Sequence, residues 1–212
     1  MIPVIDFQSP QALTQIETAY TTLGFAVFEN ALTQQSQLDI TEWHQEMQKF
    51  FELDLDTKLA YPYDADTNLG YSRVGDENVD PTAPKDIKES FNYNNTRMAE
   101  HLWPDLTGFK QRALRSIEVA DDLTLRILDK FDTILDAEHT LVRAHQQPYN
   151  TTRVIHYPAY TGELEHRQMR IGEHSDYGTI TLLWQINDVP GLEVQDLDGA
   201  WHAVPYRTNG VV

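Results

Sequence analysis

The spacing of apolar residues changes near residue 150, and this change limits the possible folds of the chain more than any other feature. From about residue 105 to 136, apolar side chains recur three and four positions apart, which predicts one long amphipathic helix. Beyond it, short apolar runs predict strands at 151–157, 179–185, 192–195 and 201–204, with a hairpin turn at 196–199. Helices followed by antiparallel strands predict an α+β fold, in which helices pack against a β-barrel or jelly roll.

The residues before the long helix alternate between shorter elements. Ser9 and Pro10 predict a helix start, and Thr33 and Asp54 or Asp56 are candidate caps of two further helices. Strands are predicted at 2–7, 25–28 and 89–93. Residues 62–84 are rich in Pro, Gly, Asp and Asn and predict a long loop, a feature that is often functional.

Composition excludes several classes of function. The chain has 212 residues and no cysteine, so disulfides, thiolate metal sites and cysteine nucleophiles are excluded, and a reducing cytoplasm fits. Its net charge of −17 disfavours nucleic acid and anionic membranes as partners. The first residues show no basic region followed by a long apolar run, so we expect no secretory signal, and no run of about 20 apolar residues is present. We therefore expect a cytoplasmic protein without nucleic-acid or membrane partners, and its oligomeric state stays open.

His174 and Asp176 stand two positions apart before an apolar run. Residues i and i+2 of a strand point to the same face, so an imidazole and a carboxylate would lie side by side. Two histidines and one carboxylate form the facial triad of non-haem Fe(II) oxygenases. The alternative is a surface strand with two polar residues. The strong strand predicted at 179–185 favours the first interpretation, because it places the pair at the mouth of a sheet.

Further sequence blocks accompany this pair in a fixed order. They are Ile2–Phe7, Gly24-Phe25, Phe50-Phe51 with Lys58, Gly70-Tyr71, Lys88–Phe91, Trp103-Pro104, Arg153 with His156–Pro158, Gly172–Leu183 and Gly191–Pro205. In these blocks the chain resembles the isopenicillin N synthase-like branch of the 2-oxoglutarate/Fe(II)-dependent dioxygenases. That branch includes plant flavonoid and gibberellin oxygenases and the bacterial ethylene-forming enzyme. The resemblance covers essentially the whole chain.

The resemblance implies a double-stranded β-helix (jelly-roll) core packed against N-terminal helices. It divides the chain into an N-terminal α/β region (1–105), a long helix with its connector (106–149) and the first part of the jelly-roll domain (150–212). In that family the second iron histidine and the Arg-x-Ser pair that grips 2-oxoglutarate come later than the 36 residues that follow Asp176 here. We therefore expect a core that is incomplete at the C-terminus, two of three iron ligands, and a fragment that is inactive alone. His202 falls at a variable family position and is not expected to be the third ligand.

The implied cofactors are Fe(II), the cosubstrate 2-oxoglutarate, and O₂. The implied reaction oxidises an unactivated C–H bond of a small molecule by hydroxylation, desaturation or cyclisation, with succinate and CO₂ as coproducts. One alternative is an oxidase like isopenicillin N synthase, which uses O₂ without 2-oxoglutarate. An alternative of another class is a non-catalytic β-barrel protein that binds small molecules without a metal.

The resemblance also implies roles for residues around the metal pair. Tyr157 aligns with a tyrosine beside the cosubstrate or substrate carboxylate, and Arg153 could meet a carboxylate with its planar fork. Their alternatives are a strand aromatic and a charge at the barrel rim, and Ile155 departs from the asparagine that many relatives carry. The candidate substrate-binding residues are Glu89, Phe91, Tyr177, Tyr71 and Arg73.

Overall fold

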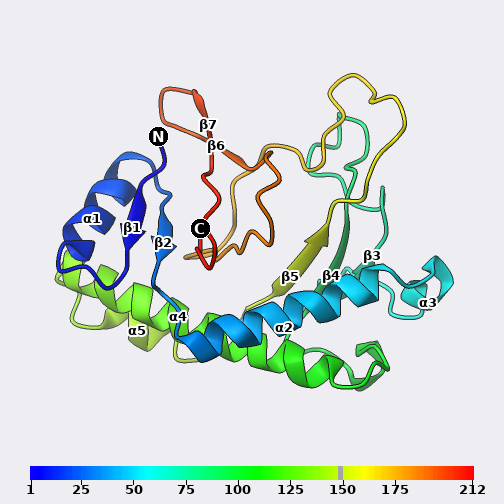
Figure 1. Ribbon diagram of the computed structural model, residues 1–212, viewed down its shortest axis with the longest axis horizontal. Helices are drawn as coiled ribbons and strands as arrows, with labels where there is room; N and C mark the ends of the chain where they lie inside the picture. The colour runs from blue at the N-terminus through cyan, green and yellow to red at the C-terminus, as the bar shows by residue number, and fades with distance from the viewer. Residues whose placement is uncertain (148–149) are drawn as a thin grey trace. The chain divides into compact units, whose positions relative to one another are not determined.

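Helices and short strands alternate through the computed structural model, which describes residues 1–147 and 150–212 (Figure 1). The helices are α1 (Ala12–Thr22), α2 (Gln34–Phe51), α3 (Leu55–Leu59), α4 (Phe109–Leu135), α5 (Thr140–Ala144) and the short 3-10 helix η1 (Glu100–Leu102). The strands are β1 (Val4–Asp6), β2 (Val27–Glu29), β3 (Gly70–Ser72), β4 (Glu89–Tyr93), β5 (Thr152–His156), β6 (Glu193–Gln195) and β7 (Trp201–Ala203).

The described residues form two units. Unit 1 holds residues 1–40, 118–147 and 178–212, and unit 2 holds residues 41–117 and 150–177. Helices α2 and α4 each contribute one part to either unit.

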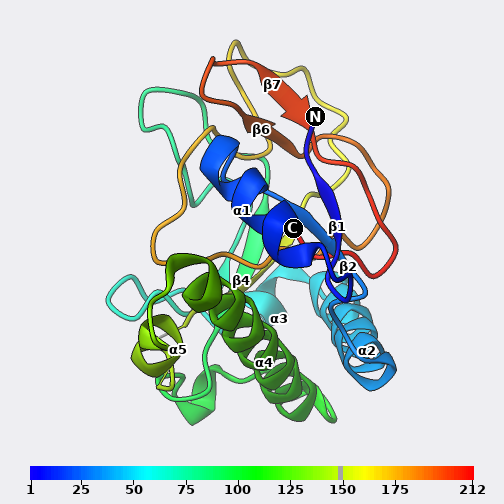
Figure 2. The same cartoon turned by 90° about the vertical axis from the view of Figure 1, so that its left-hand side faces the viewer.

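Unit 1 is built around a parallel pair of strands. β1 pairs with β2, and α1 lies alongside them (Figure 2). Ile16 of α1 and Leu123 and Ile127 of α4 are fully buried in the same apolar cluster, because residues four apart share one face of a helix. β6 and β7 form an antiparallel hairpin in this unit.

Unit 2 contains the antiparallel sheet β3-β4-β5, with β4 in the centre. Phe91 and Tyr93 of β4 pack against Phe50 of α2 and Phe109 of α4. The ring centroids of Phe50 and Phe91 lie 5.0 Å apart, and those of Phe91 and Phe109 lie 5.7 Å apart in an edge-on arrangement. This aromatic core fixes one face of the sheet.

Most predicted elements are confirmed. The long helix lies inside its predicted bounds, and β5, β6 and β7 fall within three of the predicted strands. The turn is also confirmed, since the Gly199 amide donates to the Asp196 carbonyl oxygen. The Thr33 hydroxyl accepts from the Ser36 amide at 3.1 Å, and the Asp54 carboxylate caps α3, as predicted. The coarse class, helices with small sheets, is confirmed.

Three predictions are wrong. Residues 179–185 form no strand, because their backbone has no strand partner along its length; Leu183 only exchanges hydrogen bonds with Val212. α1 begins after Gln11 instead of at Ser9, whose hydroxyl accepts from the Gln11 amide in a preceding turn. The loop predicted at 62–84 contains β3, and α5 and η1 were not predicted.

The predicted domain division stays a prediction, and the end of its connector at residue 149 lies outside the described residues. Within 1–147 and 150–212, no helix has the length and apolarity needed to cross a membrane.

The aromatic core of unit 2 predicts a large effect of truncating Phe50, which is fully buried. Phe50→Ala should lower the free energy of unfolding by about 3–5 kcal/mol, because it removes apolar contacts and leaves a cavity. Leu38→Ala on the same helix is the control, since Leu38 is 51% exposed. Urea unfolding of the two variants measures the difference, and equal midpoints would contradict the assignment of Phe50 to the core.

Candidate functional site

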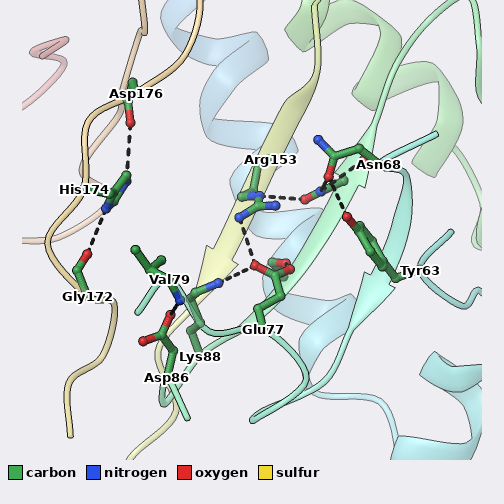
Figure 3. A network of polar contacts seen from close by, with 12 residues as sticks. Tyr63, Asn68, Glu77, Val79, Asp86, Lys88, Arg153, Gly172, His174 and Asp176 are labelled. Carbon is green, nitrogen blue, oxygen red and sulfur yellow. Dashed lines mark hydrogen bonds and ion pairs between the residues drawn. The ribbon is translucent and has the colours of Figure 1, made fainter. Parts of the chain in front are cut away.

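His174 and Asp176 lie together on an irregular segment of unit 2 (Figure 3). His174 Nε2 is 3.3 Å from Asp176 Oδ1, and the two side chains are 40% and 50% exposed. His174 Nδ1 lies 2.8 Å from the Gly172 carbonyl oxygen, which only accepts hydrogen bonds. Nδ1 therefore carries the hydrogen, and in the neutral ring Nε2 presents its lone pair beside the carboxylate. An imidazole nitrogen and a carboxylate oxygen are both common ligands of transition metals.

The segment before this pair is attached to the connection between β3 and β4, which we call the 73–88 loop. The Ile87 amide donates to the Met169 carbonyl oxygen at 3.0 Å, and Arg167 pairs with Asp80 at 2.6 Å. A Cβ placed on Gly172 would lie 3.3 Å from the Cβ of Val79, so the two backbones approach closely. The position of the His174/Asp176 pair thus depends on the 73–88 loop.

Glu77 of this loop lies over the sheet face that is opposite the aromatic core. Its carboxylate accepts from Lys88 Nζ at 2.5 Å, from Ser90 Oγ at 2.9 Å and from Arg153 Nη1 at 3.0 Å (Figure 3). Burial alone would raise the pKa of the Glu77 carboxyl, but the bond from Lys88 and the charge of Arg153 hold it below its usual value. Glu77 is therefore an anion between two cations.

Arg153 lies near the start of β5, and Tyr157 follows the last residue of this strand. Arg153 stands opposite Asn92 in the strand register, and its Nε donates to the Asn92 side-chain oxygen at 2.9 Å. Burial raises the pKa of the Tyr157 hydroxyl, Asp86 raises it further, and the charges of Arg153 and Arg170 oppose the shift. Tyr157 is nevertheless 43% exposed, so its protonated hydroxyl can donate to a ligand.

Glu89 lies on the other face, inside a second polar cluster. Its carboxylate accepts from Lys58 Nζ at 2.8 Å, from the Tyr71 hydroxyl at 2.5 Å and from His156 Nδ1 at 2.7 Å. Burial would raise the pKa of this carboxyl, but the hydrogen bonds from Lys58, Tyr71 and His156 together lower it. The cluster joins α3 and all three strands of the sheet.

Three of the five candidate substrate residues lie together, because Tyr71 stands opposite Phe91 in the strand register and bonds to Glu89. Phe91 is fully buried in the aromatic core, and Tyr71 and Glu89 bond to each other. Arg73 pairs with Asp76 on the loop, and Tyr177 is 99% exposed. Their role in substrate binding stays a prediction.

His202 has a different partner. In the β6–β7 hairpin its Nε2 lies 2.6 Å from an oxygen of Asp196. Within the described residues, no group of three or more His, Asp or Glu side chains is arranged to hold a metal.

Sequence reasoning did not single out Glu77 or Asn92. A signal for Asn92 exists, because Lys88, Ser90 and Asn92 occupy every second position and so share one face of a strand. Glu77 has no such signal, since it reaches the sheet from a loop.

Comparison with known proteins places the chain among the non-haem dioxygenases. The sequence matches the family described as "non-haem dioxygenase in morphine synthesis N-terminal" over residues 2–111. The match covers more than half of the chain, and the chain belongs to this family. The predicted resemblance to the wider group of 2-oxoglutarate/Fe(II) dioxygenases is confirmed by relatives of that name.

Two such relatives are fungal 2-oxoglutarate-dependent dioxygenases. The chain is 30% identical to htyE of Aspergillus rugulosus over 192 residues, which is 82% of this chain and 57% of the relative. It is 31% identical to gloF of Glarea lozoyensis over 196 residues, which is 83% of this chain and 58% of the relative. The chain thus spans less than two thirds of the length of these curated relatives.

A solved structure is also similar. It is the crystal structure of a full-length Neurospora crassa protein in complex with alpha-KG, which matches with a TM-score of 0.83 and 27% identity. The match covers 99% of this chain and 71% of the Neurospora crassa protein.

The depressed pKa of Glu89 makes part of the stability depend on pH. A carboxyl with a lowered pKa in the folded state stabilises the protein above its ordinary pKa of 4.5, and this stabilisation is lost as the pH falls toward the folded value. Glu89→Gln should therefore cost about 3 kcal/mol at pH 7, since it leaves buried Lys58 without a charged partner. The cost should shrink below about pH 4.5. Urea unfolding of the wild-type protein and of Glu89→Gln between pH 7 and pH 4 measures this cost. A difference in unfolding free energy that does not change with pH would contradict the role of the Glu89 charge.

Proposed function

We propose that this chain is part of an Fe(II)- and 2-oxoglutarate-dependent oxygenase that oxidises an unactivated C–H bond of a small molecule. The observation that carries the proposal is the adjacent pair of donor atoms, His174 Nε2 and Asp176 Oδ1, 3.3 Å apart on an accessible segment. The fungal relatives named as 2-oxoglutarate-dependent dioxygenases support the cosubstrate, as does the Neurospora crassa structure with alpha-KG.

The donor set fits Fe(II). One imidazole nitrogen and one carboxylate oxygen are two of the three ligands of the facial triad. The hydrogen bond to the Gly172 carbonyl oxygen orients the His174 ring and fixes which nitrogen is the ligand. The third ligand of the proposed site is a histidine that follows residue 212, as the resemblance implies. When bound, the iron supplies the chemistry that activates O₂, and the residues of this chain hold and orient it.

Arg153 and Tyr157 are the proposed contacts for a carboxylate of 2-oxoglutarate. A guanidinium offers parallel N–H donors to a carboxylate, and a phenol that stays protonated offers one more. The polar face of β3-β4-β5 would then be the inner face of the double-stranded β-helix, and residues 150–212 its first part. The proposed outcome at this site is hydroxylation, desaturation or cyclisation of the substrate.

The proposal predicts that the full-length protein loses Fe(II) affinity when either donor is removed. His174→Ala and Asp176→Ala should each weaken equilibrium Fe(II) binding at least about 100-fold, because a two-ligand site holds the ion weakly. His166→Ala is the matched control, since His166 lies on an exposed loop of the same unit. Anaerobic titration with Fe(II) measures the affinities. Unchanged affinity in both variants would refute the metal assignment.

The proposed cosubstrate contact predicts the effect of removing one hydroxyl. Tyr157→Phe should raise the KM for 2-oxoglutarate about tenfold, because a hydrogen bond to a charged group is lost. Fe(II) affinity should stay the same, which separates this role from support of the metal pair. Succinate formation by the full-length protein gives the KM, and an unchanged value would remove Tyr157 from the cosubstrate site.

A further inference from the structure

The carboxylate of Glu77 fills a site that is built for an anion. Lys88, Ser90 and Arg153 surround it with an ammonium, a hydroxyl and a guanidinium, all within 3.0 Å. These are the groups that recognise carboxylates in proteins. The carboxylate of Glu77 and the ammonium of Lys88 both come from the 73–88 loop, whereas Ser90 and Arg153 come from the paired strands β4 and β5.

A second observation is an unused donor on the same face. The Ser72 hydroxyl is buried and has no hydrogen-bond partner among the described residues. Ser72 stands opposite Ser90 in the register of β3 and β4, so the two side chains project from the same face. Glu77 therefore leaves one buried donor of this face unsatisfied, which costs free energy.

The charges also require an anion. The side chain of Lys88 is only 1% exposed, and a buried ammonium without a counter-ion is strongly unfavourable. Arg153 adds a second positive charge at 3.0 Å from the Glu77 carboxylate. Two cations thus share one carboxylate, in a chain whose net charge is −17.

We propose that Glu77 is an internal substitute for a ligand, and that a small-molecule carboxylate replaces it on Lys88, Ser90 and Arg153. The incoming carboxylate also gains the Ser72 hydroxyl. This inference rests on the proposed function and adds to it that the substrate or the cosubstrate presents a carboxylate here. Glu77 is then a positioning residue that holds the 73–88 loop over the sheet until the ligand binds.

The exchange is tied to the metal pair through this loop. The loop that carries Glu77 also contacts the segment before His174, through Ile87 with Met169 and through Asp80 with Arg167. When the Glu77 carboxylate leaves the sheet, these contacts transmit the change to the segment that carries the donor atoms. Ligand binding and the arrangement of the metal pair are therefore coupled.

Carboxylate titrations of the full-length protein without metal test the inference. The probes are 2-oxoglutarate, benzoate and, as an uncharged match for benzoate, benzamide. Glu77→Gln removes the competing charge and should tighten carboxylate binding about fivefold, with benzamide unaffected. Glu52→Gln makes the same charge change at an exposed position of unit 2 and should leave affinity unchanged. Arg153→Gln should abolish the gain.

Comparison of the benzoate and 2-oxoglutarate titrations identifies whether the carboxylate belongs to the substrate or to the cosubstrate. Tighter benzoate binding with unchanged 2-oxoglutarate assigns the site to the substrate, and the reverse assigns it to the cosubstrate; either result supports the inference. Equal or weaker affinity for both probes in Glu77→Gln overturns it. If that variant does not fold, as judged by circular dichroism, Glu77→Asp retains the charge with a shorter reach and is expected to tighten binding in the same direction. Because no iron is present, failure here is distinct from failure of Fe(II) binding in the wild-type protein.

Discussion

The central position of β4 is the constraint on which unit 2 depends. Alternate residues of a strand point to opposite faces, so β4 presents Phe91 and Tyr93 to the aromatic core and Ser90 and Asn92 to the other face. Pairing with β3 and β5 fixes the register of both faces at once. A shift by one residue would place polar groups in the core, and the aromatic packing therefore also determines where the polar cluster lies.

The elements with strong local signals were predictable from sequence. The apolar stripe of α4 and the alternation of β5 each depend on residues that are close in the chain. The caps at Thr33 and Asp54 are hydrogen bonds to the amide three residues later. The strand expected at 179–185 does not form. An apolar run becomes a strand only when another strand pairs with it. That pairing is a tertiary property, which no window of sequence contains.

The same distinction applies to the site. The spacing of His174 and Asp176 placed an imidazole beside a carboxylate, although an irregular segment and not a regular strand brings them together. The bond from Arg153 to Asn92 joins residues 61 positions apart, and that from Arg153 to Glu77 joins residues 76 apart. Such contacts follow from strand register and loop path. The two clusters around Glu77 and Glu89 are therefore visible only in the folded chain.

The contacts between the 73–88 loop and residues 167–172 also restrict how this family member can vary. Surface loops usually accept insertions and deletions, because few contacts fix their length. Here Asp80 and Ile87 are held to Arg167 and Met169, and Glu77 is held to the sheet. A change in length between Glu77 and Ile87 would displace the segment that carries His174 and Asp176. Diversification of the loop is thus expected by substitution at fixed length, with length changes confined to the stretch before Glu77.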